Sequence, residues 1–143
     1  SSIGIGGLLA EGIGDTIRVS LTTDGREEVK VGREILRSLG LTSFGVTLVS
    51  CPTCGRLEVD LFRIAGEIEK AVAQVKTPLK VAVMGCLVNG PGEAKDADIG
   101  ISAGNGSAIL YVKGESKGKI TEEEIIPRLL EEINLLEKTM ATV

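Results

Sequence analysis

The sequence predicts an α/β fold built around one aliphatic core. Segments with strand character alternate with segments whose apolar residues recur at helical spacing, a pattern typical of a sheet covered by helices. Of the 143 residues, 43% are hydrophobic, yet the aromatic residues are limited to two Phe and one Tyr. A chain of this length can bury one compact core, and that core must be mainly aliphatic.

The first part of the chain predicts two strands separated by a helix. Thr16 to Leu21 has the character of a strand. Glu27 to Leu39 predicts a helix, with Asp24 as a plausible N-cap, acidic residues in the first turn and Gly40 as the C-terminal stop. Phe44 to Val49 predicts the next strand.

The middle of the chain predicts a second helix and a buried strand. The helix spans Leu57 to Val75, and its apolar residues are Leu57, Leu61, Ile64, Ile68, Val72 and Val75. We interpret this stripe as core packing and not as a cofactor-binding motif. Leu79 to Met84 is a continuous apolar run of the kind that is buried on both faces of a parallel sheet.

The last third predicts a hairpin and a terminal helix. Asp98 to Ser102 and Ala108 to Val112 flank Ala103 to Gly106, a good hairpin signal. Thr121 and Glu124 fit a capping box for the helix that follows. The apolar positions expected on that helix are Ile126, Leu129, Ile133, Leu136 and Met140. Pro127 is awkward inside a helix, so the helix is expected to kink or to start later.

Composition and charge exclude several classes of function. The net charge is −4, and neither a Lys/Arg cluster nor an aromatic stacking row is present, which argues against nucleic acid as the natural partner. No apolar run approaches the roughly 20 residues of a membrane span. Three apparently reduced cysteines without a targeting segment predict a cytoplasmic protein. Because the chain starts at Ser1 without Met, we expect it to be a piece of a longer protein.

The glycines near the N-terminus do not form a recognisable phosphate-binding loop. Their spacing matches neither Gly-x-Gly-x-x-Gly nor the P-loop with its Lys, so turns are expected instead. These glycines are Gly4, Gly6, Gly7, Gly12 and Gly14. The absence of His from the sequence also excludes Ser/His/Asp and Cys/His catalytic sets.

Three cysteines and one glutamate predict a metal centre. Cys51 and Cys54 form a Cys-x-x-Cys pair, Cys86 follows a predicted buried strand, and Glu93 closes the sequence Asn-Gly-Pro-Gly-Glu. The set is typical of an incomplete iron–sulfur cradle in which a carboxylate replaces the missing thiolate, and a weakly held oxygen ligand leaves one iron open to substrate. Zinc remains an alternative with Glu93 as its fourth ligand, whereas a thioredoxin-like pair leaves Cys86 unexplained and an odd cysteine count disfavours a disulfide framework.

The predicted elements bring the two cysteine segments together. Each segment follows the carboxyl end of a strand, which is the edge where open α/β sheets usually bind ligands. Asn89 to Gly92 predicts a tight turn that brings Glu93 back beside Cys86.

These motifs resemble one known family, the 4-hydroxy-3-methylbut-2-enyl diphosphate synthases of the methylerythritol phosphate route to isoprenoids, in their C-terminal part. The matching segments are Glu11 to Leu21, Cys51 to Asp60, Val81 to Glu93 and Ala97 to Ile101. The resemblance implies a triosephosphate-isomerase-type barrel followed by an α/β iron–sulfur domain similar to domains of sulfite and nitrite reductases. Residues 1–42 are then the last elements of the barrel and residues 43–143 the cluster domain, and turnover is not expected from this segment alone.

The resemblance also implies an activity and roles for individual residues. The family reductively opens 2-C-methyl-D-erythritol 2,4-cyclodiphosphate to 4-hydroxy-3-methylbut-2-enyl diphosphate, with electrons from ferredoxin or flavodoxin, and works as a homodimer. By resemblance, Cys51, Cys54 and Cys86 hold three irons of a [4Fe-4S] cluster, and Glu93 caps the fourth until substrate displaces it. Asn89 is similar to the family's substrate-contacting asparagine. Thr16 and Arg18 are candidates for diphosphate contacts.

Electrostatics predict a role for one further residue. A [4Fe-4S] cluster with three thiolates and one carboxylate carries a formal charge of about −2, which reduction makes more negative. Arg56 and a helix N-terminus following Cys54 are expected to compensate this charge. A pure electron carrier and a zinc-stabilised structural module are the alternatives, and the first of these has no need of a labile ligand such as Glu93.

Overall fold

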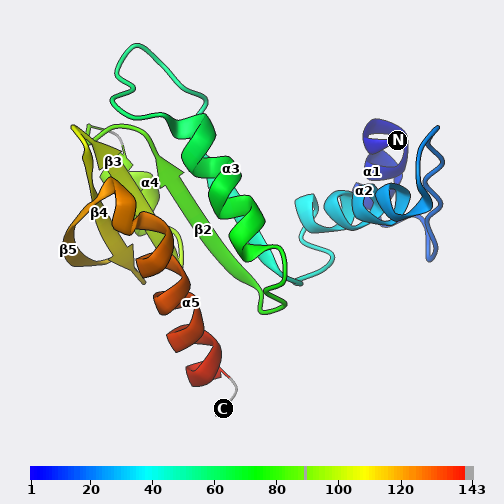
Figure 1. The fold of residues 1–143 in the computed structure, drawn as a ribbon. Coiled ribbons are helices and arrows are strands. Elements are labelled where there is room, and N and C mark those ends of the chain that lie inside the picture. Colours follow the sequence, from blue (N-terminus) through cyan, green and yellow to red (C-terminus); the bar gives the residue numbers. More distant parts are fainter. Residues whose placement is uncertain (89, 141–143) are drawn as a thin grey trace. The chain divides into compact units, whose positions relative to one another are not determined.

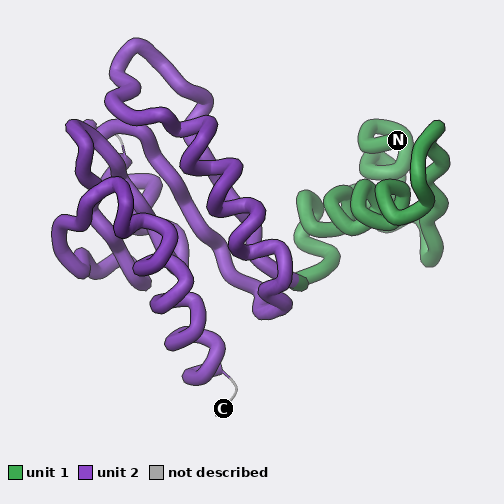
Figure 2. Tube along the Cα trace, in the orientation of Figure 1, with its two compact units in different colours: residues 1–44 green, residues 45–143 purple. Residues whose placement is uncertain are grey.

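The computed structural model describes residues 1–88 and 90–140, which divide into two compact units. Unit 1 spans Ser1–Phe44 and unit 2 spans Gly45–Val143 (Figure 2). The division lies two residues beyond the boundary expected from the sequence. No helix in the described ranges combines the length and the apolar character of a membrane span.

Unit 1 consists of two helices and an extended segment between them. Helix α1 spans Ser2–Ala10 and contains Gly4, Gly6 and Gly7, so the turns expected at these glycines are wrong. Gly12 and Gly14, beyond the end of the helix, do adopt positive φ, as residues in turns often do. Helix α2 spans Gly25–Ser38, whereas Glu27 to Leu39 was predicted, and the predicted N-cap Asp24 accepts a hydrogen bond from the Arg26 amide (2.8 Å).

The strand expected over Thr16 to Leu21 is absent from unit 1. A strand is defined by backbone hydrogen bonds to a neighbouring strand, and the described part of unit 1 contains none. The segment is extended and unpaired, and its last amide, that of Leu21, donates instead to Glu28 Oε1 at 2.9 Å.

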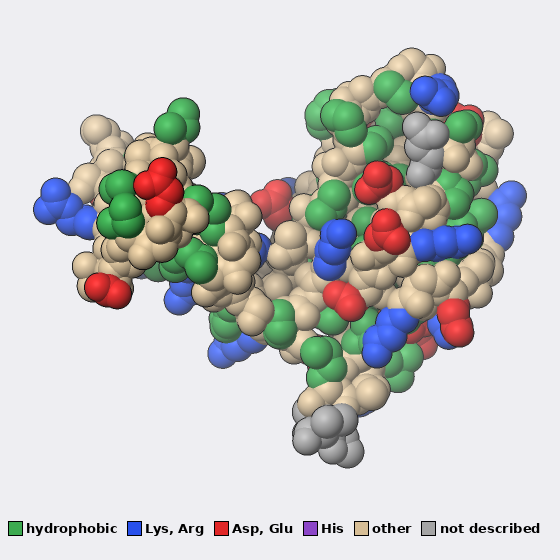
Figure 3. Space-filling model, turned by 180° about the vertical axis from the view of Figure 1, so that it is seen from behind, with side chains coloured by type: hydrophobic (Ala, Val, Ile, Leu, Met, Phe, Trp, Pro, Cys, Tyr) green, Lys and Arg blue, Asp and Glu red, His purple; other side chains and the backbone are tan. Residues whose placement is uncertain are grey.

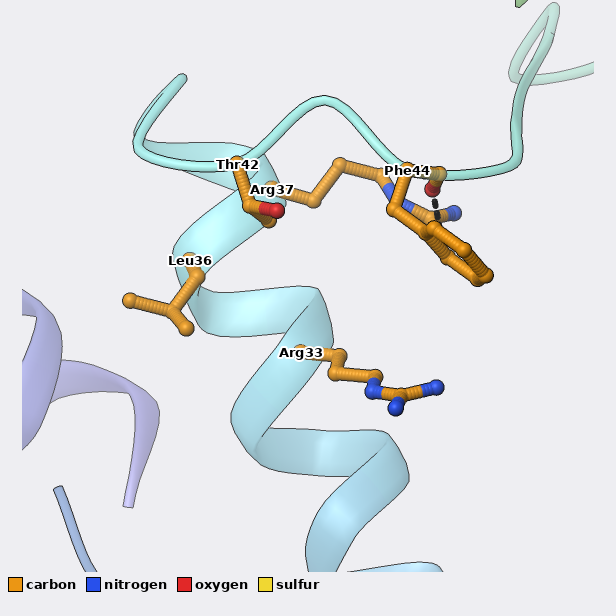
Figure 4. A pocket seen from close by; sticks show the side chains of 5 residues that line it. All are labelled: Arg33, Leu36, Arg37, Thr42 and Phe44. Carbon is orange, nitrogen blue, oxygen red and sulfur yellow. Dashed lines mark hydrogen bonds between the residues drawn. The ribbon is translucent and has the colours of Figure 1, made fainter. Parts of the chain in front are cut away.

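The segment after α2 folds back onto the helix and encloses a small cavity. Arg33 lies over the Phe44 ring, 5.5 Å from its centre, and Arg37 Nη2 donates to the Phe44 carbonyl at 3.1 Å (Figure 4). The cavity measures about 300 Å³, and Leu36 and Thr42 complete its lining. The next residue, Gly45, donates its amide to the Lys76 carbonyl in unit 2 (2.9 Å).

Unit 2 contains a mixed sheet in the order β1-β2-β3-β4-β5, counted over the described residues. Strands β1, β2 and β3 are parallel, and β4 and β5 follow as antiparallel strands. The strands span Val46–Ser50, Leu79–Met84, Ile99–Gly104, Ser107–Val112 and Glu115–Thr121. The α/β fold class predicted from the sequence is therefore confirmed.

Helices cover both faces of the sheet (Figure 1). Helix α3 (Leu61–Val72) and helix α5 (Ile125–Met140) lie on one face, and the short α4 (Gly90–Lys95) lies on the other. The main core lies under α3 and α5 and contains the predicted apolar stripe of α3, with Ile64 and Ile68 almost fully buried. At about 25 cal/mol per Å² of apolar area removed from water, this aliphatic burial is the main stabilising contribution to unit 2.

The C-terminal elements follow the predicted signals with one addition. The β3–β4 hairpin turns at Asn105 (φ 51°) and Gly106 (φ 68°), both left-handed as a two-residue turn requires. Thr121 and Glu124 form the predicted capping box around a 3-10 turn, Glu122–Glu124. Hydrogen bonds from the Thr121 amide and hydroxyl hold the pKa of Glu124 below its ordinary value. Pro127 then lies in the first turn of α5, where its missing N–H is tolerated. Strand β5 was not predicted.

Candidate metal centre

The first cysteine segment is an irregular loop between β1 and α3. Cys51 is half-buried against Ala82 and Met84, and Cys54 is exposed. Between them Thr53 has φ 50°, a left-handed conformation that a β-branched residue rarely adopts. Strain of this kind concentrates at functional loops, where the surrounding structure over-determines it.

The second cysteine segment follows β2. Gly85 lies directly against the first segment, since a Cβ there would lie 2.3 Å from Leu57 Cδ1 and would force that side chain to move. Cys86 is half-buried, and its carbonyl accepts a hydrogen bond from Ser102 Oγ at 2.9 Å. Close contact with Leu57 therefore explains the glycine before Cys86.

Backbone hydrogen bonds join the two segments at one edge of the sheet. The Cys51 amide donates to the Val83 carbonyl (3.3 Å), and the Glu58 amide donates to the Gly85 carbonyl (3.1 Å). Both loops leave the carboxyl ends of parallel neighbours β1 and β2, at the same end of the sheet in Figure 1. The topology thus brings together the two halves of the predicted ligand set.

Glu93 lies on a helix and not behind a tight turn. Residues Gly90–Lys95 form α4, in which Glu93 is exposed in the first turn. The turn expected over Asn89 to Gly92 is therefore wrong from Gly90 onward, because Gly90 packs closely on β3 and the following residues continue as a helix. Asn89, the predicted substrate-contacting residue, lies outside the described residues.

The donor set fits an iron–sulfur cluster in kind and number, although its side chains do not converge. None of the three thiols forms a disulfide within the described part of the chain. Over the same residues, no group of three Cys, Asp or Glu side chains surrounds a common point. Thiolates on two joined loops plus one carboxylate nevertheless match the ligand chemistry of such clusters, and the chain supplies no His to favour zinc.

The predicted helix N-terminus after Cys54 is wrong. Helix α3 begins only at Leu61, and its N-cap Asp60 accepts a hydrogen bond from the Arg63 amide at 3.1 Å. Residues 57–60 instead serve the contact between the loops, since Leu57 packs on Gly85. Arg56 is exposed in the same loop, two residues after Cys54, and stays the predicted source of positive charge for this site.

Sequence reasoning missed Glu58. Its carboxylate lies against β3, since a Cβ on Gly104 would be 2.6 Å from Glu58 Oε2 and 3.0 Å from Leu87 Cγ. The Glu58 carboxylate and the Leu87 side chain therefore both lie close to Gly104 on β3. No local sequence pattern marks Glu58, because Gly104, which lies beside its carboxylate, is far from it along the chain.

The candidate diphosphate contacts lie in unit 1. Thr16 and Arg18 are both exposed in the extended segment before α2.

Acidic and basic side chains are interspersed on the face of unit 2 seen in Figure 3. That face carries no basic patch of the kind that binds nucleic acid, over the residues described there.

Comparison with known proteins finds one family model that matches unit 1 and another that matches unit 2. The model of the GcpE protein C-terminal domain matches residues 47–135, and that of the GcpE TIM-barrel domain matches residues 1–33. Relatives named 4-hydroxy-3-methylbut-2-en-1-yl diphosphate synthase (flavodoxin) include one from Clostridium acetobutylicum, 58% identical over 94% of this chain, and one from Geobacillus kaustophilus, 54% identical over 95%. The chain spans 38% of the length of the first relative and 36% of the second. The chain belongs to the GcpE family, and its residues correspond to the C-terminal part of that family's proteins.

Proposed function

We propose that this chain is the cluster-bearing part of a 4-hydroxy-3-methylbut-2-en-1-yl diphosphate synthase. The observation that carries the proposal is the joining of the two cysteine loops, through the Glu58 amide and the Gly85 carbonyl, at the carboxyl edge of the sheet. Cys51, Cys54 and Cys86 would hold three irons of a [4Fe-4S] cluster, and Glu93 the fourth.

The ligand set suits substrate chemistry better than electron carriage. When bound, the cluster supplies electrons at low potential and one coordination position that a substrate oxygen can enter. Glu93 suits that position because a carboxylate is a harder and weaker ligand to iron–sulfur than a thiolate, and because its side chain is exposed. The guanidinium of Arg56 would stabilise the negative charge added on reduction.

The reaction would be a reductive ring opening with dehydration. The substrate, 2-C-methyl-D-erythritol 2,4-cyclodiphosphate, takes up two electrons and two protons, its ring C–O bond breaks, and one hydroxyl leaves as water. Asn89 would donate a hydrogen bond to the departing hydroxyl, and Thr16 and Arg18 would contact the diphosphate. The electrons would come from flavodoxin, which the names of the bacterial relatives print, or from ferredoxin.

The whole protein would contain parts beyond this chain. Residues 1–42 would form the last elements of a TIM-type barrel, and residues 43–143 the cluster domain. Since the barrel holds the rest of the substrate site in this proposal, the segment alone would be inactive, and the complete enzyme would act as a cytoplasmic homodimer.

Anaerobic reconstitution with iron and sulfide tests the proposal. We expect about four irons per chain, with a Mössbauer spectrum in which one iron site differs from three thiolate-rich sites. Stoichiometric zinc with negligible iron would replace the proposal by the structural-zinc alternative.

A further inference from the structure

Strand β3 contacts both cysteine loops through one of its faces. Its residues alternate, and Ile99, Ile101 and Ala103 point into the core under α3 and α5. The opposite face carries Gly100, Ser102 and Gly104, which we call the small-residue face of β3. Backbone and loop atoms approach this face so closely that a Cβ on either glycine would lie within 2.6 Å of a neighbouring atom.

Ser102 holds the second cysteine loop at two points. It is the fully buried polar side chain among the described residues, with 0% exposed, and its hydroxyl donates to the Cys86 carbonyl at 2.9 Å. The same Oγ would lie 2.3 Å from a Cβ on Gly90, so the chain at Gly90 rests directly on this hydroxyl. One oxygen atom therefore contacts the loop both at Cys86 and at the start of α4.

Gly104 lies where the first loop meets the second. Glu58 Oε2 and Leu87 Cγ both lie within 3.0 Å of the position of a Gly104 Cβ, and the Glu58 amide is bonded to the Gly85 carbonyl. The small-residue face of β3 thus sets the spacing between the loops, and Ser102 is its one residue that forms a side-chain hydrogen bond to a cysteine.

We propose that Ser102 is a positioning residue for the Cys86 ligand. Its buried hydroxyl fixes the backbone from which the Cys86 thiolate reaches the cluster, so that the thiolate is held in one orientation. Removing the hydroxyl leaves the Cys86 carbonyl without this donor and frees the loop to relax. This inference rests on the function proposed above, and deepens it by naming what orders one ligand.

The test compares two serines that make the same kind of bond. Ser102→Ala removes the bond to Cys86, and the matched control Ser107→Ala removes a bond from Ser107 Oγ to the Gly104 carbonyl (3.0 Å) in the β3–β4 hairpin. Both variants of the full chain are reconstituted anaerobically. The readouts are the rate of iron loss to a chelator and the Fe–S stretching frequencies in the resonance Raman spectrum, with urea unfolding of the metal-free chains to record any loss of stability.

We expect Ser102→Ala to lose iron about tenfold faster, the factor that corresponds to roughly one hydrogen bond, and to shift the Fe–S frequencies. Ser107→Ala should change neither, even where its metal-free stability falls equally. If Ser102→Ala loses iron at the wild-type rate and keeps the wild-type Fe–S frequencies, the inference is overturned while the proposed function stays intact. A wild-type chain that takes up no cluster overturns both.

A second variant keeps the test decisive if Ser102→Ala does not fold. Ser102→Gly also removes the hydroxyl and adds no atom to the closely packed face of β3, so it should show the same faster iron loss and shifted Fe–S frequencies. Wild-type iron loss and frequencies in Ser102→Gly, with the metal-free chain folded, would refute the role of the hydroxyl.

Discussion

Replacing Gly100 by Ala should displace α4 and destabilise unit 2. A Cβ at Gly100 would lie 2.0 Å from the Ala94 carbonyl oxygen and 2.5 Å from its carbon. Both atoms are backbone, so no side-chain rotation relieves the contact, and the helix that carries Glu93 must move. Overpacking of this kind costs typically 1–3 kcal/mol, and contact with backbone places Gly100→Ala at about 3 kcal/mol.

The same substitution at Gly66 provides the control. Gly66 lies in the interior of α3, and a Cβ there would meet nothing within 4 Å. Ala is a better helix former than Gly by about 1 kcal/mol, so Gly66→Ala should stabilise unit 2 by up to that amount. The two identical substitutions are thus expected to change stability in opposite directions.

Urea unfolding followed by tyrosine fluorescence measures both variants. Tyr111 is the one tyrosine of a chain without Trp, is 5% exposed and lies in unit 2, so its emission reports that unit. With a slope of about 1.5 kcal/mol per M, the Gly100→Ala midpoint should fall by ~2 M and the Gly66→Ala midpoint should rise by up to ~0.7 M. Tyr111 pairs with Gly100 across the β3–β4 ladder, so the substitution at Gly100 can change the intensity of its emission. The midpoints are therefore compared, and the intensities are not. A Gly100→Ala midpoint equal to that of the wild type would refute the close packing of α4 on β3.

Three further outcomes are expected. Arg56→Ala should lower the cluster potential in protein-film voltammetry by removing a positive charge, and an unchanged potential would count against that role. Glu93→Cys should keep the iron yet abolish turnover in the full-length enzyme, so full activity would contradict the open-iron mechanism. Because the pKa of Glu124 is lowered by bonds from Thr121, its stabilisation is complete above the ordinary glutamate pKa of about 4.3 and is lost as pH falls through the lower folded-state pKa. Glu124→Gln should therefore flatten the loss of urea stability below pH ~4.3, and an unaltered acid profile would show that the capping carboxylate contributes nothing.

Local signals predicted most elements of the sheet and helices. The strand Leu79–Met84 was predicted with its observed bounds, because a continuous apolar run is buried whatever surrounds it. The capping box at Thr121 and the hairpin at Asn105 depend on neighbouring residues alone, and both are confirmed. Strand β5 escaped prediction because Glu115 to Lys119 are polar and exposed, as an edge strand allows.

The errors lie where distant residues decide the local structure. The periodicity of α3 extends back to Leu57, yet that side chain packs on Gly85 of the other loop and the helix starts at Leu61. The segment from Thr16 shows strand character but has no neighbour to pair with in the described part of unit 1. The cysteines were recognised from their spacing, whereas Glu58 and Ser102 gain their importance from contacts across the sheet that no local pattern displays.

The peptide group between Phe44 and Gly45 is held by hydrogen bonds on both of its edges. Its oxygen accepts from Arg37 in unit 1, and its N–H donates to Lys76 in unit 2, so a single planar group is held from both sides. The backbone beside this plane can turn only about the bonds that flank it, and Gly45, with φ 74°, adopts an angle that a side chain would disfavour. A side chain at Gly45 would therefore strain the backbone beside a peptide group that is already held on both sides.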